Sequence, residues 1–226
     1  GISLIGEVLT QVPTLPLSPP NASTFAQFLA ARLQDFPTVS AVVHALHSLI
    51  HHHELHNKKG DDTNPHFIVR SLFNELHIPS LRQPVRKEIY EILAKLLCQY
   101  PETMQVIGRD YVVGVIQSVD MEKDPRNLVV SFNLIRDTVK HIPVFYEFAE
   151  ELFEVISCYF PISFRSDSAD IDLVKREDLQ ESLLDSMSCS SAFAKYAIPF
   201  FLDKINEVAP DEKLEVFHAL AHCIER

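Results

Sequence analysis

The stretch "MEKDPRNLVVSF", Met121 to Phe132, joins two amphipathic runs and shows how this chain folds back on itself. Asp124 is a residue type that caps the free N–H groups at a helix start, and Pro125 suits the first helical position. The apolar residues that follow recur at helical spacing and form one stripe: Leu128, Val129, Phe132 and Leu134. The stretch therefore predicts a turn followed by a helix that begins at Pro125.

Arg126 lies in the first turn of this expected helix, where the helix dipole disfavours a cation. An acidic neighbour, Glu122 or Asp124, would compensate for it. Two interpretations of Arg126 stay open: a structural role in the turn, or a contact with a partner protein.

Apolar residues recur at helical spacing along the rest of the chain, as in "FAQFLAARL", "VRKEIYEILAKLL" and "FAEELFEVI". No stretch sustains a two-residue alternation, so the predicted fold class is all-α. Four prolines each follow a short polar segment and indicate helix starts: Pro37, Pro65, Pro84 and Pro125.

Paired in order, the expected helices give a repeat of about 40 residues, which is typical of HEAT and armadillo repeats. The predicted units are 22–56, 64–100, 103–140, 143–188 (with a loop at 161–175) and 192–226. The chain is thus expected to be a single HEAT-repeat domain over residues 1–226, a right-handed superhelical solenoid of about five helix pairs. It begins without methionine and ends in an amphipathic run, so we expect it to be an excerpt of a longer chain.

Composition narrows the classes of partner. The chain has 226 residues, 46% of them hydrophobic, and its 20 Lys and Arg against 31 Asp and Glu give a net charge of −11. Such a charge repels a phosphate backbone, so no direct nucleic-acid partner is expected, and it suits partner proteins with basic surfaces. No apolar run approaches the roughly 20 residues that span a bilayer, and the N-terminus lacks a signal-peptide pattern, so a soluble chain with no membrane partner is expected.

Catalytic and cofactor motifs are missing from the sequence. The four cysteines, Cys98, Cys158, Cys189 and Cys223, form no CxxC pair and are predicted to be reduced, mostly buried thiols of an intracellular protein. Five glycines build neither a P-loop nor a GxGxxG turn, and no GxSxG elbow occurs. We therefore expect no enzyme activity, no catalytic residue and no cofactor, and Gly114 is interpreted as a site of close helix packing or a bend.

The run "HALHSLIHHHELH", His44 to His56, is the one pattern that suggests a metal. The pairs His47/His51 and His52/His56 have the i,i+4 spacing that places two imidazoles on one helix face. The HExxH pattern is not met, because His56 comes one position early after His53, and no third ligand is evident. The simpler interpretation is a helix C-terminus whose imidazoles face water, so no metal site is expected, and a metal-binding helical enzyme using His44–His56 is an unfavoured alternative.

Two blocks go beyond a generic helical repeat: "MEKDPRNLVVSFNLI" (121–135), and "FAEELFEVISCYFPISF" (148–164) with "REDLQESL" (176–183) and "AKYAIPFFLDKI" (194–205). They resemble the N-terminal region of the Mms-nineteen family, the large HEAT-repeat protein of the cytosolic iron–sulfur cluster targeting complex. The resemblance is clear over about 105–205, where the family pattern K-D-P-R-N-L is met by residues 123–128. After the second block, "RSDSADID" (165–172) stands where most members carry a proline-rich segment, so partner binding through that segment is not carried over.

The resemblance implies a scaffold without enzymatic activity. It would bring the cluster-carrying assembly subunits to client apoproteins such as DNA helicases and polymerases, and associate with the repair and transcription helicase complex, in the cytoplasm and nucleus. The family's C-terminal repeats hold the assembly machinery, so this chain would be the target-facing or architectural part, and the cluster would be carried by a partner.

Candidate protein contacts, chosen by expected exposure, are Arg126, Asn127, Phe164, Arg165 and Asp167. The segment 161–175 is too long for a tight turn, and it either packs over the repeats or presents a docking loop. A HEAT scaffold of the transport or coat type has the same repeat physics and stays open as the alternative function.

Overall fold

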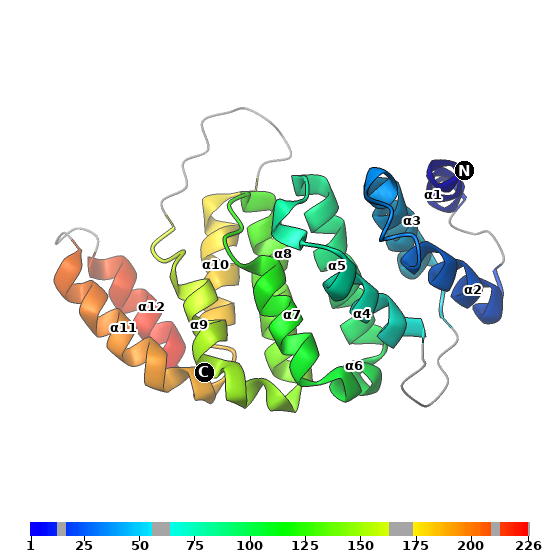
Figure 1. Cartoon of the computed structure of the whole chain (residues 1–226). Helices are drawn as coiled ribbons and strands as arrows, with labels where there is room; N and C mark the ends of the chain where they lie inside the picture. Colours follow the sequence, from blue (N-terminus) through cyan, green and yellow to red (C-terminus); the bar gives the residue numbers. More distant parts are fainter. Residues whose placement is uncertain (13–16, 56–63, 163–173, 209–212, 226) are drawn as a thin grey trace. The chain divides into compact units, whose positions relative to one another are not determined.

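The structure is a computed structural model that describes residues 1–12, 17–55, 64–162, 174–208 and 213–225. Within these ranges the chain forms twelve α-helices joined by loops and short 3-10 turns, without a strand (Figure 1). The all-α prediction is therefore confirmed for the described residues, whereas the right-handed superhelix stays a prediction. Among these helices, none is both long and apolar enough to cross a membrane.

The chain divides into two compact units, residues 1–118 and 119–226. The boundary falls inside the predicted repeat unit 103–140, and the single domain and the repeat bounds remain predictions. Each compact unit is described by itself below.

The first unit packs its helices in two layers, as stacked helix pairs do. Its helices are α1 (Ile2–Gln11), α2 (Pro19–Ala30), α3 (Val39–His52), α4 (Asn64–Glu75), α5 (Gln83–Gln99), α6 (Pro101–Ile107) and α7 (Arg109–Val119). In one layer α3 lies between α1 and α5, and in the other α4 lies between α2 and α6. The layers meet where α2 packs on α3 and α4 packs on α5.

Helix α1 was not predicted, since the first helix was expected to begin at residue 22. It buries Leu9 and Gly6 against α3, and the hydroxyls of Thr10 and Ser48 are hydrogen-bonded at 2.7 Å. A Cβ at Gly6 would lie 3.3 Å from the His44 ring, so the missing side chain lets the two helices approach closely.

The expected helix 103–119 is broken in two at Gly108. Gly108 has φ 57°, a left-handed conformation that glycine adopts without steric cost, and it separates α6 from α7. Further along α7, the Phe73 ring of α4 packs where a Gly114 side chain would stand. The prediction of close helix packing at Gly114 is thus confirmed.

The second unit is also layered. Its helices are α8 (Pro125–His141), α9 (Ala149–Ser157), α10 (Arg176–Met187), α11 (Ala194–Glu207) and α12 (Lys213–Glu225). Helix α10 packs between α8 and α12 in one layer, while α9 and α11 form the other. The core between α9 and α11 is aromatic, with T-shaped ring contacts from Phe153 to Phe193 and from Phe160 to Phe201.

Three of the four helix starts predicted from prolines are confirmed. Pro65, Pro84 and Pro125 occupy the first or second position of α4, α5 and α8. Pro37 instead lies in a 3-10 turn, Phe36–Thr38, and α3 begins after it. A similar 3-10 segment, Pro143–Phe148, replaces the first part of the expected helix 143–160.

Candidate functional site

The turn before α8 is built around the buried side chain of Glu122, which is 3% exposed. Its Oε1 accepts hydrogen bonds from the backbone N–H groups of Lys123 (2.9 Å) and Asp124 (3.1 Å), and its Oε2 accepts one from Asn127 Nδ2 (2.9 Å). The Tyr159 hydroxyl donates to the backbone carbonyl of Glu122 at 2.7 Å, so the segment after α9 is tied to the same turn. The carboxylate is thus satisfied although it is buried.

Asp124 caps α8, as the sequence predicted, and of the two acids expected to compensate for Arg126, Glu122 or Asp124, it is the one that binds the guanidinium. Its Oδ1 accepts from the Arg126 backbone N–H at 3.0 Å, and the guanidinium holds both carboxylate oxygens, Nε to Oδ1 at 2.9 Å and Nη2 to Oδ2 at 2.8 Å. These bonds lower the pKa of Asp124 below its ordinary value. Arg126 has the structural role that the first interpretation gave it, and since its side chain is exposed, its partner contact stays a prediction.

The exposure by which Asn127 was chosen is wrong. Its side chain is fully buried and donates to Glu122. Helix α8 is buried both on the face of Asn127 and Leu134 and on the face of Leu128 and Phe132. A partner contact by Asn127 remains untested, and burial argues against it. Phe164, Arg165 and Asp167 lie outside the described residues, as does the segment 165–172.

Two histidines of α3, His44 and His47, contact carboxylates of α5, so the expectation that the imidazoles all face water is wrong for these two, whereas His52 is exposed. His44 Nδ1 lies 2.7 Å from Glu88 Oε1, and His47 Nε2 lies 2.8 Å from Glu91 Oε2. The His51 ring lies against that of His47, with centroids 4.1 Å apart, and burial lowers the pKa of His51. Across the described part of the chain, no three His, Cys, Asp or Glu side chains are grouped as a metal site requires, and His56 lies outside it.

The four cysteines are free thiols, but they are not mostly buried. Cys98 and Cys158 are exposed, and Cys189 and Cys223 are partly buried. Burial raises the pKa of Cys189 to about 12 and that of Cys223 to about 11. Since the thiolate is the nucleophile and the metal ligand, these two side chains are poorly suited to either role.

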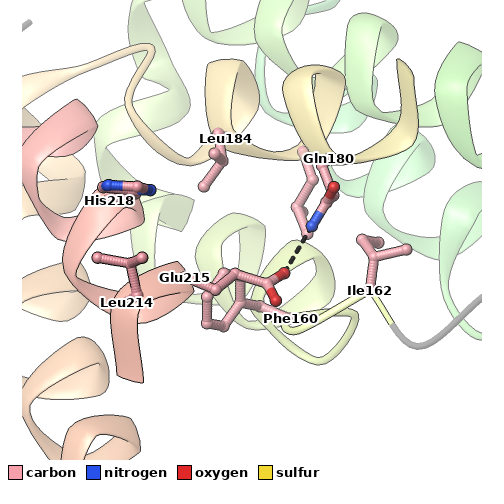
Figure 2. Close-up of a pocket in the computed structure, with 8 residues that line it drawn as sticks. Phe160, Ile162, Gln180, Leu184, Leu214, Glu215 and His218 are labelled. Atoms are coloured by element: carbon pink, nitrogen blue, oxygen red, sulfur yellow. Dashed lines mark hydrogen bonds between the residues drawn. The ribbon is translucent and has the colours of Figure 1, made fainter. Parts of the chain in front are cut away.

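A pocket of about 440 Å³ opens within the second unit, and no sequence motif pointed to it (Figure 2). Its walls come from three segments: the stretch after α9, helix α10 and helix α12. The lining residues are Phe160, Ile162, Gln180, Leu183, Leu184, Leu214, Glu215 and His218. The pocket is therefore mainly apolar, with one carboxylate and one imidazole.

Glu215 is held across this pocket by two residues of α10. Gln180 Nε2 donates to its Oε1 at 2.6 Å, the bond drawn in Figure 2, and Arg176 Nη2 contacts both oxygens at the longer distances of 3.3 and 3.4 Å. The Arg176 Nε also donates to the Ile162 carbonyl at 3.0 Å, which fixes the guanidinium at the rim.

Comparisons with known proteins agree with the resemblance. A family model described as "Dos2-interacting transcription regulator of RNA-Pol-II" matches residues 1–226. Similar proteins named "MMS19 nucleotide excision repair protein homolog" occur in Dictyostelium discoideum (37% identical over all of this chain and 20% of the relative), Homo sapiens (35%, 69% of this chain and 15% of the relative) and Arabidopsis thaliana (28%, 99% of this chain and 20% of the relative).

The chain spans about a fifth or less of the length of these relatives. Similarity to the Dictyostelium protein covers the full chain, so it extends beyond the range of about 105–205 that the motifs indicated. With a match over every residue, this chain belongs to the MMS19 family, in the part described by the N-terminal family model.

Proposed function

We propose that this chain is part of a non-enzymatic adaptor that helps deliver iron–sulfur clusters from the cytosolic assembly machinery to apoproteins, notably enzymes of DNA repair and replication. The observation that carries the proposal is family membership over all 226 residues. The relatives are named for nucleotide excision repair and the family model for transcription by RNA polymerase II. Both fit an adaptor that serves the repair and transcription helicase complex, in the cytoplasm and nucleus.

The cysteines support a role in which the cluster is cargo on a partner. Iron–sulfur clusters are held by several convergent thiolates. Here the raised pKa values keep Cys189 and Cys223 protonated near neutral pH, and all four thiols are far apart in sequence. The chain's own contribution would be to bind and orient proteins.

The stacked helices and the net charge of −11 support protein binding. Helical repeats present extended ridged surfaces, and a strongly acidic surface steers partners that carry basic patches. Clients would thus be recognised by surface shape and charge, with no chemical step on this chain.

The test is affinity capture from cytosol with three baits: this 226-residue chain, the full-length Dictyostelium relative, and that relative without its matching fifth. Bound proteins are identified by mass spectrometry and then tested for direct binding in purified form. We expect the full-length relative to hold the assembly subunits and cluster-requiring helicases, and this chain to hold the helicases or polymerases alone.

Two results would contradict the proposal. If removal of the matching fifth changes no client, the chain has no part in client binding. If this chain instead holds transport receptors or coat subunits, the alternative scaffold function is correct.

A further inference from the structure

The pocket between α10 and α12 combines concavity, an apolar lining and a carboxylate in one place. Its volume of about 440 Å³ lies within the roughly 300–1,000 Å³ of ligand pockets. A cavity of roughly 150 Å³ lined by apolar side chains accepts benzene. The pocket therefore has room for two apolar side chains, and a single inserted side chain would leave part of it empty.

The apolar lining is partly open to solvent. Leu214 is 62% exposed, and Leu184 projects toward the same space from α10 (Figure 2). Exposed leucines that converge on a concave surface gain free energy when a partner covers them, at about 25 cal/mol per Å² of apolar area. The shape and lining alone do not identify the ligand, and the charge of the surroundings favours a cationic one.

The electrostatic surroundings are acidic. Helix α10 carries four carboxylates, Glu177, Asp178, Glu181 and Asp185, and one cation, Arg176. The first three are exposed. Asp185 lies near Arg136 of α8 (3.9 Å) and His222 of α12 (3.3 Å), so it contributes less to the acidic surroundings than the other three. Glu215 adds a fifth carboxylate inside the pocket, where Arg176 reaches it only at 3.3 Å or more. This weak internal pair shows where a cation is attracted, and a better-placed guanidinium or ammonium would bind the carboxylate more strongly.

We propose that this pocket is a docking site for a short basic peptide segment of a partner protein. Two apolar side chains of the segment enter the space lined by Leu184, Leu214 and Phe160, and an adjacent Lys or Arg binds Glu215. The exposed carboxylates of α10, Glu177, Asp178 and Glu181, attract the other cations of the segment. The inference rests on the proposed function, in that the partner is a protein bound by the adaptor.

The experiment selects ligands without assuming a sequence. A random peptide library is displayed on phage and selected on the 226-residue chain, and the enriched peptides are synthesised with a fluorescent label for polarisation measurements. We expect the enriched sequences to share two apolar residues next to Lys or Arg. Their affinity should fall as salt is raised, because charge attraction contributes to it.

Substitutions then locate the site. Glu215→Lys and Leu214→Ala should each weaken the enriched peptides by about tenfold or more, as loss of a central contact does. The matched controls are Glu154→Lys, an exposed carboxylate on α9, and Leu202→Ala, an exposed leucine on α11, and both should stay within about twofold. Both changed pocket residues are themselves part-exposed, and circular dichroism of each variant checks that the helices are kept.

Three outcomes would overturn the inference. Enriched peptides that lack basic residues contradict the role of Glu215. Enriched peptides that bind Glu215→Lys and Leu214→Ala with the same affinity as the unchanged chain place the contact elsewhere. Binding of a small apolar dye in the pocket without any enriched peptide indicates a small-molecule site. Concentration-dependent dimerisation that Glu215→Lys abolishes, again without an enriched peptide, indicates contact with a second copy.

Failure of this inference and failure of the proposed function are distinguishable. If the Glu215→Lys chain captures the same clients from cytosol and no peptide is enriched, the adaptor function stands and the pocket has no part in it. If basic apolar peptides bind at the pocket and no cluster-requiring client is captured, the docking site stands and the iron–sulfur function is wrong.

Discussion

Replacing Glu122 by alanine should lower the free energy of unfolding of the second unit more than substitution of any exposed residue near it. The change removes the acceptor of three hydrogen bonds: two from backbone N–H groups and one from the fully buried Asn127 amide. A buried donor deprived of its partner costs about 1–3 kcal/mol, and each lost backbone bond about 1 kcal/mol. We expect a loss of about 3–5 kcal/mol in the free energy of unfolding.

Two further variants separate the hydrogen bonds from the charge. Glu122→Gln keeps the shape and one carbonyl oxygen for the two backbone donors, and the Asn127 amide can turn so that its oxygen accepts from the new amide. The cost should therefore be about 1 kcal/mol. Lys123→Ala, at the exposed neighbouring position, is the control and should change stability by about 0.5 kcal/mol or less.

Denaturant unfolding followed by far-ultraviolet circular dichroism gives these free energies. The pair Glu122→Ala and Asn127→Ala is also measured together, because Asn127→Ala alone leaves a buried carboxylate oxygen without this donor. We expect a coupling energy of about 1 kcal/mol or more between the two substitutions. If Glu122→Ala costs less than about 1 kcal/mol, or no more than Lys123→Ala, the carboxylate does not hold the turn and the reasoning is refuted.

Three more results follow from the packing and titration of particular side chains. Gly114→Ala should destabilise by about 1 kcal/mol in denaturant unfolding, because a Cβ there would lie 2.6 Å from Phe73 Cζ and overpacking outweighs the better helix propensity; in a Phe73→Ala background the same change should stabilise. The hydrogen bond with His47 lowers the pKa of Glu91 from 4.5. The stabilisation of the folded chain by this bond is therefore present above pH 4.5 and is lost as the pH falls through the lowered pKa. Denaturant unfolding of Glu91→Gln should therefore show a deficit relative to the unchanged chain that shrinks below pH 4.5, and a constant deficit would exclude this linkage. Native thiol labelling at about pH 8 should be slowest at Cys189, whose thiolate fraction is about one in ten thousand at a pKa of about 12, and unfolding should make all four cysteines equally reactive.

The sequence predicted those features that depend on neighbouring residues. Asp124 as the cap and Pro125 as the first helical residue are both confirmed. An acidic partner for Arg126 is confirmed as well, and the structure decides between the two expected acids, Glu122 and Asp124, in favour of Asp124. All of these contacts involve residues within two positions. The all-α class also follows from local periodicity, which depends on the order of side chains and little on what covers them.

The sequence did not predict features of the fold that depend on tertiary packing. Helix α1 was overlooked because its stability comes from α3, which it contacts along its length, and its own sequence includes glycine and β-branched residues. The break at Gly108 divides a run that keeps helical periodicity on both sides. The glycine itself was the available signal in the sequence. A glycine within a helical run does not reveal its φ, which is 57° in the structure.

The sequence of α8 contains a signal for the burial of Asn127. Along α8 the residues Asn127, Ser131, Leu134 and Thr138 repeat at helical spacing and are all buried. Ser131 and Thr138 donate to backbone carbonyls of their own helix, so small polar side chains satisfy themselves on a covered face. A second stripe of small polar residues beside an apolar one therefore indicates a helix that is covered on two sides.

Most of the residues by which the family was recognised hold the fold, and only some of them line the pocket proposed for partner binding. In the motif at 123–128, Asp124 and Asn127 are engaged in the turn and Leu128 is buried, and in the later block Tyr159 bonds to the Glu122 carbonyl. These contacts fix the path of the chain, and within 123–128 they leave Lys123 and Arg126 exposed to a partner. The pocket joins side chains from three separated segments. Within the recognised blocks lie Phe160, Ile162, Gln180 and Leu183, and outside them lie Leu184, Leu214, Glu215 and His218. The sequence signature therefore reports mainly how the second unit folds and includes one part of the pocket lining. The proposed binding specificity also depends on α12, which adds Leu214 and Glu215.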